Sequence, residues 1–235
     1  MKLSAPVYRL KREARLLSRR ENIPLHKALD RIAATEGFRS WSLLAAKLPE
    51  PVDELFSRLH PGDLVLVGAR PGHGKTLTSL KLAVKAMDLG NRAVFFTLEY
   101  VEKDVLDRFG AIGVDRTRFG GLFEFDSSDA ISSDYIVEKL AAAPSGTLAI
   151  IDYLQLLDQK REKPDLMTQI RTLKAFARNR GVIFVFISQI DRSYEPSTKP
   201  CPDINDIRLP NPLDLSLFSK TCFLHNGEVR FQAAN

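Results

Sequence analysis

The nine residues from Gly68 to Thr76 have the composition of a loop that binds phosphate. They read Gly-Ala-Arg-Pro-Gly-His-Gly-Lys-Thr. Backbone N–H groups in such a glycine-rich turn face phosphate oxygens, Lys75 reaches the β- and γ-phosphates, and the Thr76 hydroxyl is a ligand for Mg²⁺. The sequence therefore predicts a site for ATP and Mg²⁺. The predicted nucleotide-binding residues are Ala69, Arg70, Pro71, Gly72, His73, Gly74, Lys75 and Thr76.

The residues on either side of this loop favour a strand before it and a helix after it. An apolar run at 64–67 precedes the loop, and a helical pattern begins near Lys75. A helix that starts there directs the positive end of its dipole at the same phosphates. The alternative is an ordinary tight turn with a surface lysine, and the flanking strand and helix make that interpretation the weaker one.

Three polar residues at the ends of other apolar runs extend the predicted site. Asp152 ends the run 148–152, where a carboxylate holds the magnesium ion through water or through Thr76. Glu99 ends the run 94–99 and is the candidate base that orients and deprotonates the attacking water. Gln189 follows the run 184–188, and its amide is a candidate sensor of the γ-phosphate. A helix-capping role is the alternative for both carboxylates.

Strands and helices alternate through residues 52–235, as in an α/β protein with a parallel sheet. The predicted strands lie at 64–67, 93–97, 122–125, 148–152 and 182–188, and the predicted helices at 75–89, 101–112, 131–142 and 166–180. Strands that are nearly continuous in apolar residues are covered on both faces, so this region is predicted to be a doubly wound nucleotide-binding core. Runs at 221–225 and 228–232, joined by Asn226-Gly227, predict a closing hairpin with a type I′ turn.

The first 48 residues differ from this region in charge and form a separate predicted segment. Residues 1–50 hold 11 Lys and Arg against 5 Asp and Glu, a balance of +6 in a chain whose net charge is +5. Helical spacing predicts three helices, at 7–20, 24–35 and 40–47. The first helix carries Arg9, Arg12, Arg15, Arg19 and Arg20. This face either binds nucleic-acid phosphates or is an ordinary solvated surface, and the prolines at 49 and 51 predict a hinge after it.

Composition excludes several classes of protein. No apolar run approaches the ~20 residues that span a bilayer, and the first residues lack the apolar region of a signal peptide. The sequence therefore predicts a cytoplasmic protein without a membrane partner. Cys201 and Cys222 have no metal-ligand spacing and indicate neither a zinc site nor a disulfide framework.

Four blocks together resemble the RecA-like motor domain of DnaB-type hexameric replicative helicases. These blocks are 61–76 with the phosphate loop, 95–99 (Phe-Phe-Thr-Leu-Glu), 151–156 (Ile-Asp-Tyr-Leu-Gln-Leu) and 188–193 (Ser-Gln-Ile-Asp-Arg-Ser). They occur in the order of the family and span roughly 52–225. The resemblance accounts for Ala69 at a position where the generic loop has glycine, because the family's loop commonly begins Ala-Arg-Pro.

The resemblance implies a fold, roles and partners. The fold is an α/β RecA-like P-loop NTPase core with a mainly parallel sheet, preceded by the small basic helical segment. By resemblance Lys75 and Thr76 bind phosphate and Mg²⁺, Asp152 serves the metal, Glu99 is the catalytic base, and Gln189 couples the γ-phosphate to DNA-contacting loops that flank 191–215. The implied partners are single-stranded DNA, further copies of the chain in a ring or filament, and proteins of replication or of a plasmid or phage.

Two departures from the family leave alternatives open. The short basic segment stands in place of the family's primase-interacting N-terminal domain, and the chain contains no Lys-x-Arg pair of the kind that reaches a neighbour's ATP site. The arginines after residue 180 are Arg192, Arg208 and Arg230. An arginine finger is worth ~10³ or more in rate, so we expect slow hydrolysis without one. The alternatives are a nucleotide-dependent DNA-binding or loader-like switch and a recombinase-like filament former.

Overall fold

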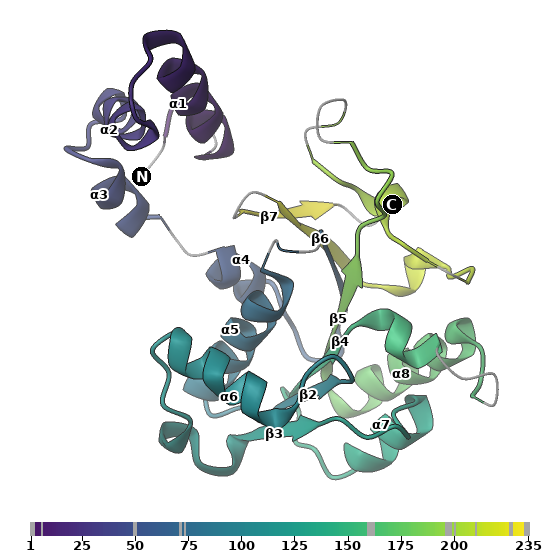
Figure 1. The fold of residues 1–235 in the computed structure, drawn as a ribbon. Helices are drawn as coiled ribbons and strands as arrows, with labels where there is room; N and C mark the ends of the chain where they lie inside the picture. Colours follow the sequence, from purple (N-terminus) through teal and green to yellow (C-terminus); the bar gives the residue numbers. More distant parts are fainter. Residues whose placement is uncertain are drawn as a thin grey trace. The chain divides into compact units, whose positions relative to one another are not determined.

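The computed structural model describes residues 3–5, 7–48, 51–70, 72, 74–158, 163–195, 199, 201–209, 211–225 and 228–232. The chain divides into two compact units, Met1–Pro51 and Val52–Asn235. Figure 1 shows the helices and strands of each unit.

Seven strands form a single sheet in the second unit, within the residues that the structure describes, in the order β3-β2-β4-β5-β1-β6-β7. The six strands from β3 to β6 in that order are parallel, and β7 pairs antiparallel with β6. The strands are β1 (Leu64–Ala69), β2 (Ala93–Thr97), β3 (Phe123–Asp126), β4 (Leu148–Asp152), β5 (Ile183–Gln189), β6 (Lys220–His225) and β7 (Glu228–Gln232). The mainly parallel sheet confirms the predicted α/β fold.

Helices cover both faces of this sheet, which explains why its strands are apolar throughout. Successive side chains of a strand point to opposite faces. Leu64 and Leu66 of β1 belong to a core cluster with residues of α7 and α8, whereas Val65 and Val67 belong to a cluster with residues of α4, α5 and α6. Figure 1 shows α5 and α6 on one side of the sheet and α7 and α8 on the other. The helices are α4 (Pro51–Ser57), α5 (Lys75–Asp88), α6 (Glu102–Ala111), α7 (Ser133–Lys139) and α8 (Leu166–Arg180).

Several details differ from the sequence prediction. Helix α7 begins at Ser133 rather than 131, because the Ser132 side chain accepts a hydrogen bond from the Tyr135 N–H and caps the helix there. Helix α4, which was not predicted, begins at Pro51, the last residue of the predicted hinge. Residues 49 and 50 of that hinge lie outside the described part, as does the predicted turn at 226–227. Within the described residues, four short 3₁₀ helices were also not predicted: η1 (Arg116–Leu122), η2 (Leu154–Asp158), η3 (Ile204–Asp206) and η4 (Leu215–Leu217).

The first unit is built from three helices, α1 (Val7–Glu21), α2 (Leu25–Thr35) and α3 (Trp41–Ala46). Its buried residues are Leu10, Ala14, Ala28, Ala33 and Leu44. Ser40 caps α3, since its side chain accepts from the Leu43 N–H. The three helices predicted here are therefore confirmed, with ends within one or two residues of the prediction.

Candidate nucleotide site

The phosphate-type loop connects β1, which ends at Ala69, to α5, which begins at Lys75. Gly72 and Gly74 have φ angles of 79° and 77°, a left-handed conformation that favours glycine. A Cβ atom at either position would have no neighbour within 4 Å, so the backbone conformation rather than space requires glycine there. Two predicted loop residues, Pro71 and His73, lie outside the described residues.

The parallel strands bring the predicted polar residues to one edge of the sheet. Asp152 at the end of β4 pairs in register with Thr97 at the end of β2, and Glu99 follows two residues later. Gln189 at the end of β5 pairs in register with Ala69 at the end of β1. Ligands of open parallel sheets bind at this carboxyl edge.

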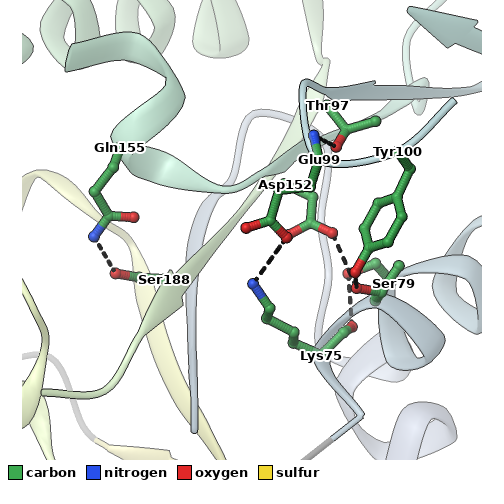
Figure 2. A network of polar contacts seen from close by, with 9 residues as sticks. Lys75, Ser79, Thr97, Glu99, Tyr100, Asp152, Gln155 and Ser188 are labelled. Atoms are coloured by element: carbon green, nitrogen blue, oxygen red, sulfur yellow. Dashed lines mark hydrogen bonds and ion pairs between the residues drawn. The ribbon is translucent and has the colours of Figure 1, made fainter. Parts of the chain in front are cut away.

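The ammonium group of Lys75 lies between two carboxylates (Figure 2). Its Nζ atom is 3.3 Å from Glu99 Oε2 and 4.0 Å from Asp152 Oδ1. The ring of Tyr153 lies beside it, with the Lys75 Nζ 5.4 Å from the ring centroid. The Lys75 side chain is 12% exposed, and its ammonium group lies next to both predicted acidic residues.

The Thr76 hydroxyl connects the loop to β4 and β2. It donates to Asp152 Oδ2 at 3.2 Å and lies 3.2 Å from the Tyr100 hydroxyl. Asp152 is fully buried, and its other oxygen, Oδ1, has no hydrogen-bond partner among the described residues. A buried carboxylate oxygen that lacks a donor, next to a threonine hydroxyl, has the oxygen chemistry that suits Mg²⁺. Since Mg²⁺ keeps waters and phosphate oxygens as ligands, few protein ligands suffice.

Burial perturbs the ionisation of Asp152. Loss of solvation raises its pKa to about 6; the nearby Lys75 ammonium opposes this rise, and the Glu99 carboxylate adds to it. Ionised Asp152 is therefore under-compensated by its protein neighbours, and a further cation at this position would stabilise it.

Glu99 does not act as the cap of the following helix. The N-cap of α6 is Val101, and the side chain of Asp104 accepts from the Val101 N–H at 3.3 Å. The side chain of Glu99 instead faces Lys75 and is 30% exposed. The Glu99 N–H donates to Thr97 Oγ1 at 3.0 Å, which fixes the turn out of β2.

Within the described residues, the side chain of Gln189 makes no hydrogen bond with the cluster of Lys75, Glu99 and Asp152. Its carbonyl accepts from the Arg208 N–H at 2.8 Å, which joins the end of β5 to the segment that follows η3. Gln155 reinforces the same connection: its Nε2 lies 3.4 Å from Ser188 Oγ and 2.5 Å from the Arg208 carbonyl oxygen. Figure 2 shows Gln155 and Ser188 beside the Lys75 cluster. Gln155 belongs to the sequence block 151–156, which by itself indicated no role for this residue.

Tyr100 and Arg108 are site residues that sequence reasoning missed. The Arg108 guanidinium lies 4.3 Å from the centroid of the Tyr100 ring, and its charge makes a small contribution that opposes the burial-driven rise of the Asp152 pKa. Tyr100 immediately follows Glu99, and that adjacency was the only available signal. Tyr100 contacts the Thr76 hydroxyl directly, and Arg108 lies over the Tyr100 ring.

A phosphate-type loop between a central parallel strand and its helix, with acidic residues at the ends of two neighbouring strands, is typical of the RecA-like P-loop fold. The sequence pattern of the DnaB-like helicase C terminal domain matches residues 48–120 and 123–212. The chain therefore belongs to the family of DnaB-like helicase C-terminal domains.

Known proteins agree with this assignment. The replicative DNA helicase DnaB of Mycoplasma genitalium is 27% identical over 192 residues, which cover 67% of this chain and 41% of that protein. The DnaB of Buchnera aphidicola is 29% identical over 199 residues, covering 69% and 43%. A solved DnaB-like replicative helicase, studied with its primase interactions, superposes with a TM-score of 0.60 at 22% identity, covering 92% of this chain and 65% of that one.

The chain spans less than half the length of these two DnaB relatives, and the family match begins at residue 48. Among the residues that the structure describes, no helix has the length and apolar character needed to cross a membrane.

Proposed function

We propose that this chain binds ATP with Mg²⁺ and hydrolyses it as a DnaB-type ATPase that acts on DNA. One observation carries the proposal: Lys75 and Thr76, at the start of α5, meet Glu99 and Asp152 from two neighbouring strand ends. Cation, hydroxyl and two carboxylates around one glycine-rich turn are the groups that phosphoryl transfer to water requires.

The proposed roles follow from the contacts. Phosphate oxygens compete for the Lys75 ammonium, and a lysine that turns to them leaves the Glu99 carboxylate free to accept a proton from water. Thr76 and Asp152 would hold the Mg²⁺, which supplies positive charge to the β- and γ-phosphates. Tyr100 orients the Thr76 hydroxyl. Gln189 is proposed to relay the state of the γ-phosphate to the segment after β5, since its carbonyl holds Arg208.

We propose single-stranded DNA and further copies of the chain as partners, because the family's relatives are replicative helicases. A replication, plasmid or phage protein is a further proposed partner; primase interactions are known for the solved DnaB-like helicase. The second candidate function is a nucleotide-dependent DNA-binding switch with little turnover. The absence of a Lys-x-Arg pair from the sequence favours it, since a motor needs a positive charge from its neighbour.

Calorimetric titration with ATP and Mg²⁺ tests the site itself. Lys75→Ala should lose nucleotide binding by about tenfold or more, because the removed charge meets the phosphates directly. Lys103→Ala removes an exposed lysine of α6 and should bind as the parent does. Equal affinities for the two variants would contradict the proposal.

A further inference from the structure

One face of α1 carries a concentration of arginine in the unit that precedes the family match. The exposed residues of this face are Arg9, Arg12, Arg15, Leu16, Arg19 and Arg20. The opposite face of the helix carries Leu10 and Ala14, which are buried in the core of the first unit. At 3.6 residues per turn, the arginines span an arc of about 140° opposite that core. We call these six residues the arginine face.

Three of the five arginines of this face, Arg12, Arg15 and Arg19, have no ion pair within the described residues. Arg20 pairs with Glu21, which also pairs with Arg31 of α2. The exposed Glu13 borders the face beside Arg9 and Arg20. Like charges three or four residues apart repel each other and destabilise a helix. An anionic partner would remove this repulsion.

The positions of the arginines and of Leu16 on α1 indicate which kind of anionic partner fits the arginine face. Leu16 is 56% exposed and lies inside the arc, with Arg12, Arg15 and Arg19 to one side of it and Arg9 and Arg20 to the other. The helix has 15 residues and is therefore about 22 Å long. A lipid surface would need a broad apolar face, and the apolar face of α1 is already buried in its own unit.

We propose that α1 binds duplex DNA by lying in the major groove. That groove is about 12 Å wide, admits one α-helix and places a phosphate backbone along each side of it. The arginines on the two sides of Leu16 then reach the two backbones, and Leu16 faces the apolar thymine methyl groups on the groove floor. This site is separate from the nucleotide site and does not depend on ATP.

Fluorescence anisotropy of the full chain with a labelled duplex, without nucleotide, tests the proposal. The triple variant Arg12→Ala, Arg15→Ala, Arg19→Ala should bind about tenfold or more weakly, and the slope of log affinity against log salt should fall by about 2–3, since each lost phosphate contact removes ~0.9. Alanine keeps the helix intact, which circular dichroism checks. The control Lys27→Ala, Arg39→Ala, Lys47→Ala removes the same charge from exposed residues of the same unit and should lose much less affinity.

Three results would overturn the proposal. Unchanged duplex binding in the α1 triple variant would make the arginine face a solvated surface or a site for an acidic protein. Equal losses of duplex affinity in the two triple variants would show that binding depends on the net charge of the unit and not on the arginine face. A loss confined to single strands of the same length would exclude the major groove. Lys75→Ala should retain duplex binding, and the α1 variant should retain ATP binding, so failure of the ATPase proposal is distinguishable from failure of this one.

Discussion

Three side chains from three different segments meet at the Thr76 hydroxyl. Thr76 is the second residue of α5, Asp152 ends β4, and Tyr100 lies in the turn between β2 and α6. The hydroxyl can present a lone pair to a cation only if its hydrogen points elsewhere, and Asp152 and Tyr100 are the two partners that orient it. We therefore propose that Tyr100 positions the hydroxyl of Thr76, the proposed magnesium ligand.

Tyr100→Phe removes one hydrogen bond from the Thr76 hydroxyl and keeps the ring under Arg108. Because such a bond contributes about 0.5–1.5 kcal/mol, Mg²⁺-dependent affinity for nucleotide should fall roughly two- to tenfold. Titration at several Mg²⁺ concentrations measures this, since a ligand-positioning role changes the magnesium dependence as well. Tyr135→Phe, which loses a hydrogen bond to Asp126 instead, is the matched control. Identical magnesium dependence in parent and Tyr100→Phe would rule out the positioning role.

Asp152→Asn tests the cost of the buried charge. The Asp152 pKa, raised from 3.8 to about 6, means that the folded chain binds a proton more tightly than the unfolded chain. The contribution of the Asp152 carboxyl group to the free energy of unfolding therefore falls as pH rises from about 4 to 6, and it stays low above that range. The variant should be more stable than the parent at pH 7.5, by on the order of 2 kcal/mol, and lose most of this advantage at pH 4. Urea denaturation at both pH values measures the difference; a difference independent of pH would contradict it.

At the scale of elements, the sequence predicts best where an apolar run ends in a strong stop signal. The bounds of β2, β4 and α8 match the prediction, and Gly181 ends α8 in the left-handed conformation with a φ of 69°. Three of the 3₁₀ helices do carry a local signal that the prediction did not use: Asp115, Asp203 and Asp214 each precede one and accept from the N–H two residues later. The register that sets β6 beside β1 instead depends on tertiary packing.

The same distinction applies to the candidate site. The phosphate loop, Glu99 and Asp152 were each indicated by local sequence signals. The structure places both carboxylates beside Lys75 of the loop. Gln189 had a weak signal and has no recorded side-chain contact with that cluster within the described residues. Tyr100 contacts Thr76 across 24 positions of sequence, and a single sequence does not indicate contacts of that range.

Gly68 in β1 tests how tightly the central strands pack. A Cβ at this position would lie 2.7 Å from a ring carbon of Phe223 and 3.0 Å from Ile190 Cδ1, and both residues are buried. Gly68→Ala should destabilise the chain by about 1–3 kcal/mol because neither neighbour has room to move. Gly110→Ala in α6, where a Cβ meets nothing within 4 Å, should instead stabilise it by about 0.5–1 kcal/mol. Urea denaturation that ranks the two variants the other way would refute this packing argument.

At the scale of the whole molecule, the proposed ring or filament needs a residue that brings positive charge to the ATP bound by the neighbouring copy. Arg230 lies on β7 opposite Phe223, and its Nη2 atom is buried, so it is poorly placed to reach another copy. Arg192 and Arg208 are exposed on the segment that follows β5. We propose that the isolated chain turns over ATP slowly and unwinds little or no duplex unless Arg192 or Arg208 supplies this charge, because loss of an arginine finger costs ~10³ or more in rate.

The most direct test of the ATPase proposal separates binding from hydrolysis at Glu99. ATP titration and single-turnover hydrolysis are measured for the parent and Glu99→Gln with Mg²⁺, with and without single-stranded DNA. We predict that Glu99→Gln binds ATP within about threefold of the parent, because the amide keeps the shape of the site, and hydrolyses it ~10²-fold or more slowly, because the base is gone. Hydrolysis by Glu99→Gln at the parental rate would show that Glu99 is not the base and would contradict the account.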